Sequence, residues 1–101
     1  MITVATIQAA VAAGYGVSIA DLTGERRTRH VVRPRQIAMF LSRRLTTRSF
    51  PQIGRRFGDR DHTTVIHACQ KVEELRSLDS IVADEIDLFL AALGAGEEHQ
   101  P

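Results

Sequence analysis

Apolar residues recur every three or four positions along most of the chain, and no segment alternates between apolar and polar residues as a half-buried strand would. The first such pattern predicts a helix from Thr3 to Ala13, ended by the glycines at positions 14 and 16. Ser18 and Asp21 have the spacing of a capping box, which predicts a short helical turn that stops at Gly24. We expect an arginine-rich loop after it, from Glu25 to Arg33.

The middle of the chain is predicted to hold one long helix and one short one. Pro34 has the position of a first helical residue, where proline is favoured, and an apolar stripe continues from there to about Arg48. Ser49 and Gln52 form a second capping box. The apolar residues that follow this box predict a short helix that ends at Gly58.

Two longer amphipathic helices complete the pattern. Asp61 can cap a helix that runs to about Arg76, and its apolar stripe comprises Val65, Ala68, Cys69, Val72 and Leu75. With about 100 degrees of rotation per residue, the opposite face consists of Thr63, His67, Gln70, Lys71 and Glu74. A last helix is predicted from Ile81 to Leu93, ended by Gly94. One domain then spans residues 1–94, and residues 95–101 form a flexible tail.

The short helix, the glycine-containing turn and the helix that starts at Asp61 have the layout of a helix-turn-helix. Many helical bundles contain such a turn, so the layout alone does not distinguish DNA binding from plain core architecture. The first turn of the second helix, however, carries small or flat hydrogen-bonding side chains: Asp61, His62, Thr63 and Thr64. A helix N-terminus that enters the major groove needs such residues, because long or apolar side chains block the base edges.

Each of these four side chains has a chemistry that suits a base edge. Aspartate can accept a hydrogen bond from a cytosine amino group, a threonine methyl can contact a thymine methyl, and imidazole can bond to either kind of edge. For Asp61 an equally good explanation is that it only caps the helix.

Charge is distributed very unevenly, although the 101-residue chain has a net charge of only +1. Eleven of its thirteen basic residues, all arginines, lie between Arg26 and Arg60, where Asp59 is the only acidic residue. Eight acidic residues against Arg76 alone lie between Glu73 and Glu98. The middle of the chain can therefore attract a polyanion and the C-terminal part cannot, unless the arginines form only a solvated face.

Several other functions find no support in the sequence. The chain has the length of one domain and lacks an apolar run long enough to cross a membrane. Cys69 is its only cysteine, so no intrachain disulfide is possible, and we expect a cytoplasmic protein at the nucleoid. His62 and His67 are not spaced like metal ligands, and there is no phosphate-binding loop and no nucleophile-and-base pattern. We therefore expect no cofactor, no metal and no enzymatic activity.

Four stretches of the chain closely resemble the C-terminal DNA-binding domain, domain IV, of the bacterial replication initiator DnaA: Arg26–Arg29, Arg33–Met39, Ser49–Gly54 and Phe57–Cys69. The resemblance extends over about Thr3 to Leu78, with the helices, the turn and the motifs in register. It implies an all-α, compact domain of about six helices with a Trp-repressor-like helix-turn-helix. It also implies binding to DnaA boxes, which are duplex sites like TTATNCACA.

The resemblance further implies roles for individual residues. Those expected in the major groove are Asp61, His62, Thr63 and Thr64, together with Phe50 and Pro51 on base methyls. Arg27 is expected in the adjacent minor groove, whose negative potential suits an arginine. Near the DNA backbone the resemblance places Arg35, Gln36 and Lys71, and we also expect Arg26, Arg29, Arg60 and His67 there. Two departures from the family bear on these roles, since Asp59 replaces the usual glycine of the turn and Phe50 a usual leucine.

Two biological settings remain open. The chain is either a stand-alone protein that binds DnaA boxes as a monomer, regulating replication initiation or transcription, or a fragment of an initiator. In a different class of function, the acidic last helix binds the DnaA initiator or an AAA+ replication regulator, and protein contact is the main activity. The alternative for that acidic face is simple solvation.

Overall fold

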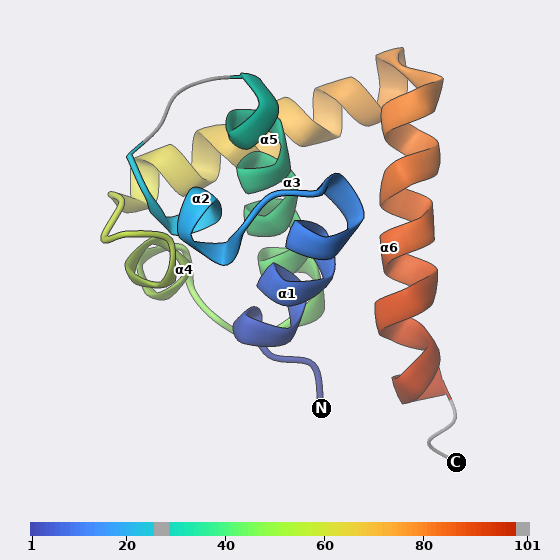
Figure 1. Cartoon of the computed structure of the whole chain (residues 1–101), viewed down its shortest axis with the longest axis horizontal. Helices are drawn as coiled ribbons and strands as arrows, with labels where there is room; N and C mark the ends of the chain where they lie inside the picture. The colour runs from blue at the N-terminus through green and yellow to red at the C-terminus, as the bar shows by residue number, and fades with distance from the viewer. Residues whose placement is uncertain (26–28, 99–101) are drawn as a thin grey trace.

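The computed structural model describes residues 1–25 and 29–98, with the side chains of residues 29 and 95–98 left aside. Within that part it contains six helices and no strand: α1 (Val4–Tyr15), α2 (Ile19–Thr23), α3 (Arg29–Leu45), α4 (Phe50–Arg56), α5 (His62–Leu78) and α6 (Ser80–Glu98) (Figure 1). The predicted all-α class is therefore confirmed.

The capping residues identified in the sequence begin the helices as predicted. Ser18 Oγ accepts a hydrogen bond from Asp21 N at 2.9 Å, and Ser18 N donates to the Asp21 carboxylate at 3.0 Å. Ser49 and Gln52 form the equivalent reciprocal pair at the start of α4. Both capping boxes satisfy backbone N–H groups that a helix start leaves without a partner.

The predicted start of α3 is wrong, because the helix begins at Arg29 and contains Pro34. Proline has no backbone N–H group to donate, so it disfavours a helix that continues through it. Here the helical turn before Pro34 is stabilised by packing against the core. Val31 in that turn is completely buried, and so is most of Arg35 just after the proline. The helix also ends at Leu45, before the predicted end near Arg48.

Two helices continue through glycines that were expected to end them. α1 includes Gly14 and ends at Tyr15, where Gly16, the second of the two predicted glycines, is the C-cap with a left-handed φ of 67°. A Cβ on Gly14 would lie 2.7 Å from the ring of Phe89, so this glycine allows α6 to approach α1. The helical backbone of α6 likewise passes Gly94 and reaches Glu98, and the flexibility of residues 95–101 stays a prediction.

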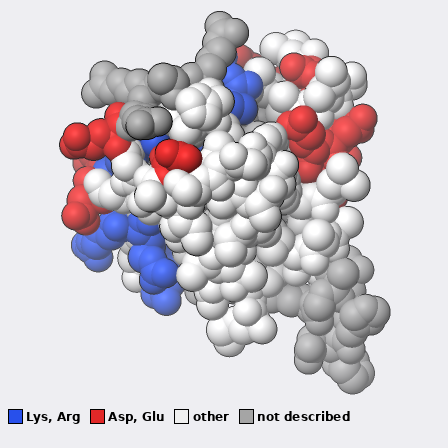
Figure 2. Space-filling view, viewed as in Figure 1, with Lys and Arg blue, Asp and Glu red and all other residues white. Residues whose placement is uncertain are grey.

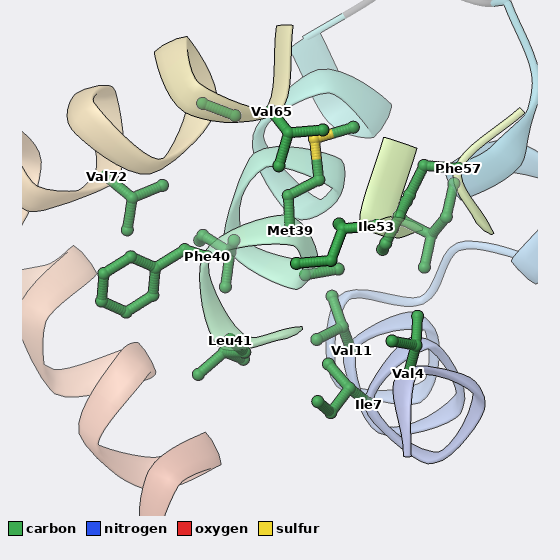
Figure 3. Packing of buried hydrophobic residues seen from close by; sticks show 14 of the residues in the cluster. Val4, Ile7, Val11, Met39, Phe40, Leu41, Ile53, Phe57, Val65 and Val72 are labelled. Atoms are coloured by element: carbon green, nitrogen blue, oxygen red, sulfur yellow. The ribbon is translucent and has the colours of Figure 1, made fainter. Parts of the chain in front are cut away.

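The core surrounds α3, which packs against each of the other five described helices. Figure 3 shows apolar side chains of α1, α3, α4 and α5 converging on one another. Ile7, Leu41 and Phe57 are among the completely buried ones. α6 lies along one side of the molecule, away from α4 (Figure 1), and its Val82 and Ile86 join the core. In the described residues no helix has both the length and the apolar character needed to cross a bilayer.

Candidate nucleic-acid interface

The turn between α4 and α5 folds tightly back onto α4. Arg60 N donates a hydrogen bond to Gly54 O at 2.9 Å. A Cβ on Gly54 would lie 2.1 Å from Arg60 O, so no other residue fits there without a shift of the backbone. The distance between α4 and α5 is thus fixed by a close backbone contact.

Two consecutive residues of this turn have positive φ angles, 79° at Gly58 and 55° at Asp59. The carbonyl oxygen of Thr23 lies 2.1 Å from where a Cβ on Gly58 would be, so the turn also contacts the end of α2. Asp59 occupies the position at which the sequence departs from the DnaA pattern. Its left-handed backbone is the geometry that glycine adopts without cost and that other residues adopt at a penalty.

The four polar residues at the start of α5 are all exposed, as a base-reading end requires. Asp61 caps the helix, with a side-chain oxygen 3.3 Å from Thr63 N, and its carboxylate lies 3.2 Å from His62 Nδ1. Hydrogen bonds from Thr63, first from its side chain and then from its backbone, hold the pKa of Asp61 below its ordinary value. The cap is therefore real, and it leaves the carboxylate accessible.

Farther along α5 the predicted division into two faces is confirmed. Val65, Ala68 and Val72 are buried. The polar face, Thr63, His67, Gln70, Lys71 and Glu74, is exposed throughout. Cys69 lies partly buried at the border between these two faces of α5, and burial raises the pKa of its thiol to about 11.

Phe50 and Pro51 lie side by side in the sequence at the N-terminus of α4, where Pro51 is exposed and Phe50 is partly buried. The guanidinium carbon of Arg43 is 4.5 Å from the centre of the Phe50 ring. Arg43 was not among the predicted site residues. It comes from α3, and nothing in the spacing of the sequence connects it with Phe50.

Residues distant in the sequence share one pocket between α3 and the start of α5. Its volume is about 220 Å³, and its polar lining consists of Arg35, Gln36, Arg60, Thr64 and His67. All five were predicted to face DNA from sequence positions up to 32 apart. Lys71 continues this surface one helical turn after His67.

The comparison with known families matches residues 4–72 to the family described as the bacterial DnaA protein helix-turn-helix. The chain belongs to this family. It is 60% identical over 83 residues to the chromosomal replication initiator protein DnaA of Rhizobium meliloti, covering 82% of this chain and 17% of that protein. It is 56% identical over 88 residues to the DnaA protein of Nitrobacter hamburgensis, covering 87% of this chain and 18% of the relative. With the DnaA protein of Cereibacter sphaeroides the identity is 48% over 94 residues, covering 93% of this chain and 21% of the relative. The chain thus spans about a fifth of the length of these DnaA relatives.

Two arginines of the DnaA helix-turn-helix have their guanidinium groups engaged inside the domain. Arg35 is 5% exposed and donates from Nε to Leu22 O at 2.9 Å and from Nη2 to Asp21 O at 2.6 Å. Arg60 donates to the carbonyl oxygens of Phe57 and Gly24. The last carbonyls of α2 are therefore held against both the turn and α3.

Three of the arginines predicted to contact DNA lie wholly or partly outside the described residues. These are Arg26 and Arg27, and Arg29 with respect to its side chain. Gln36 is partly buried, and its side-chain oxygen accepts a hydrogen bond from Arg33 Nε at 3.2 Å. Within residues 1–25 and 29–98 no three His, Cys, Asp or Glu side chains are grouped as metal ligands.

Proposed function

We propose that this chain binds double-stranded DNA sequence-specifically at DnaA-box-like sites, regulating replication initiation or transcription, with no ATPase activity of its own. The observation that carries the proposal is the exposed polar start of α5 held by a rigid turn. A recognition helix needs such preorganisation, because base contacts depend on a precise helix position.

The individual roles divide between reading bases and holding phosphates. Asp61, His62, Thr63 and Thr64 would read major-groove edges, with Phe50 and Pro51 on thymine methyls. Arg27 would read the minor groove. The residues proposed at the backbone are Arg26, Arg29, Arg35, Gln36, Arg60, His67 and Lys71.

For Arg35 and Arg60 we add a supporting role. Both donate to carbonyl groups of the domain itself, so they help to hold the recognition helix against α2 and α3.

The test is a competition titration with a duplex that contains a DnaA box and a scrambled duplex of equal length. His62→Ala and Arg27→Ala should each lose about 1 to 3 kcal/mol of binding free energy on the box and less on the scrambled DNA. Lys71→Ala should weaken binding to both duplexes alike. Equal losses on both duplexes for His62→Ala and Arg27→Ala would rule out base readout by these residues.

A second candidate function rests on the exposed apolar residues of α6. Ile81 and Leu88 are 69% and 71% exposed and lie seven residues apart on one face, next to Asp84 and Asp87. This surface favours contact with a protein, and we propose the DnaA initiator or an AAA+ replication regulator as the partner. Binding to such a partner that survives Arg27→Ala with His62→Ala, but not Ile81→Ser with Leu88→Ser, would support it.

A further inference from the structure

Three arginines outside the surface described so far gather around α4. Arg48, Arg55 and Arg56 line a pocket of about 210 Å³ together with Gln52. Figure 2 shows basic side chains collected at the lower left, over the place of α4 in Figure 1. We refer to these four residues as the α4 pocket.

The α4 pocket has the composition of an anion site. Among the described residues no acidic one lines it, and all three arginines are exposed. None of the ion pairs found among the described residues includes any of the three. Like charges in one pocket repel one another, and a bound anion removes that repulsion.

Its hydrogen-bonding groups also suit a phosphate. A guanidinium presents a planar fork of donors that matches two phosphate oxygens. The side-chain oxygen of Gln52 already accepts a hydrogen bond from Ser49 N at 2.8 Å. The amide group of Gln52 that remains is a donor, so every polar side chain of the pocket can donate to an anion.

The pocket adjoins the surface proposed to bind the box. Arg55 follows Pro51 by four residues in α4, so the two lie on the same side of that helix. DNA held at Pro51 and at the start of α5 therefore brings its own phosphates close to the pocket. This proximity raises their effective concentration and favours duplex DNA over any separate polyanion.

We propose that the α4 pocket binds backbone phosphates of the duplex that flanks the box, extending the DNA contact beyond the helix-turn-helix surface. This inference rests on the proposed function. Because phosphate contacts carry no sequence information, the pocket adds affinity and salt dependence without adding specificity.

The experiment compares the full chain with its Arg55→Gln/Arg56→Gln variant on two duplexes. One duplex contains only the box, and the other adds one helical turn, ~10 base pairs, on each side. On the longer duplex the slope of log Kobs against log salt should become shallower by ~0.9 for each phosphate that the variant no longer binds, or by ~2 for two phosphates. On the box-only duplex the variant should match the wild type, and the ratio of box to scrambled affinity should not change.

Two control variants distinguish the loss of a phosphate-binding site from a general change in net charge. Ala91→Glu/Ala92→Glu makes the same change of two charges at exposed positions of α6, on the other side of the molecule (Figure 1), and should leave the slope nearly unchanged. Arg55→Lys/Arg56→Lys keeps the two positive charges, so its slope of log Kobs against log salt should stay close to that of the wild type. Thermal melting of each variant checks that the domain stays folded.

The outcomes distinguish this inference from the proposed function. If the wild type does not prefer the box, the proposed function fails. If the wild type prefers the box but Arg55→Gln/Arg56→Gln keeps its salt slope, only the α4 pocket proposal fails. The same conclusion follows if the α6 control lowers the slope equally, or if the variant loses retention on heparin while its DNA slope stays unchanged.

Discussion

Gly58 and Asp59 show how single residues set the geometry of the recognition turn. Both have left-handed backbones, and at Gly58 the carbonyl oxygen of Thr23 also occupies the space that a Cβ would need. A left-handed backbone costs a non-glycine residue roughly 1 kcal/mol. The two positions should therefore respond to substitution in opposite directions.

We predict that Asp59→Gly stabilises the domain by ~0.5 to 1 kcal/mol, because the strain at φ 55° disappears. Gly58→Ala should destabilise it by ~1 to 3 kcal/mol, because its Cβ meets Thr23 O and its φ is unfavourable. Urea unfolding of both variants measures the two changes. A loss of stability in Asp59→Gly would mean that the Asp59 side chain contributes more than its backbone costs.

Cys69 gives a prediction about reactivity. Burial raises the pKa of its thiol to about 11, so the reactive thiolate is scarce at neutral pH. Alkylation by iodoacetamide at pH 7.5 should be at least tenfold slower in the folded domain than in urea. Mass spectrometry over time measures both rates. Equal rates would show that the structure around Cys69 opens readily and exposes the thiol.

At the residue scale, the sequence was informative where a side chain's position follows from helical phase. The exposure of His62 and Thr63 and the burial of Val65 follow directly from the period of a helix. The contacts of Arg60 with Gly24 and of Arg43 with Phe50 do not, because each joins segments whose relative placement depends on the whole fold.

The short helix α4 depends on the capping residue at its N-terminus. It has only seven residues, so its own hydrogen bonds stabilise it weakly. Ser49→Ala removes the oxygen that accepts from Gln52 N and should cost ~1 kcal/mol of stability. Thermal unfolding measures the loss, and Ser49→Asp, which retains a capping oxygen, serves as the control. If both substitutions cost the same, the cap is not the cause.

The cap of α5 adds a pH dependence. The folded-state pKa of Asp61 lies below its ordinary value, so the carboxylate stabilises the fold above that ordinary value. This contribution is lost as the pH falls through the lowered pKa. Stability measured from pH 6 downward should therefore decline less in Asp61→Asn, which keeps a capping oxygen but cannot titrate. Parallel curves for the variant and the wild type would contradict this account.

Helix boundaries were predicted most closely where a capping residue marks them. The starts of α2, α4 and α5 follow from Ser18, Ser49 and Asp61. Pro34 and Gly14 were misleading, because tertiary packing held each helix through a residue that disfavours it locally. The cost of one glycine in a helix, about 1 kcal/mol, is smaller than the gain from packing a phenylalanine such as Phe89.

Across the whole molecule, the acidic last helix lies apart from the arginine-rich α4. Figure 1 shows α4 and the acidic α6 on opposite sides of the molecule, and the arginines of the α4 pocket lie on and beside α4. α6 is therefore suited to stabilise the fold without meeting DNA. It joins the remainder of the domain partly through α1, from residues about 70 positions earlier.

Tyr15 makes that connection. Its hydroxyl donates to Glu85 Oε1 at 2.7 Å, and its ring lies 5.6 Å from the ring centre of Phe89. Tyr15→Phe keeps the ring contact and removes only the hydrogen bond to a charged acceptor, so it should cost roughly 1 to 2 kcal/mol. Urea unfolding measures this loss, and hydrogen exchange should show faster opening of α6.

The same variant tests whether α6 acts independently of DNA binding. Burial, followed by the hydrogen bond to Glu85, raises the pKa of Tyr15, so the wild type should lose stability as the pH rises above the ordinary tyrosine value, about 10. Tyr15→Phe should lack that alkaline decline. Its affinity for the box should equal that of the wild type at neutral pH, because the hydrogen bond joins α1 to α6 and the proposed base-reading residues lie at the start of α5. A parallel loss of box affinity would instead mean that α6 holds the recognition helix in its binding position.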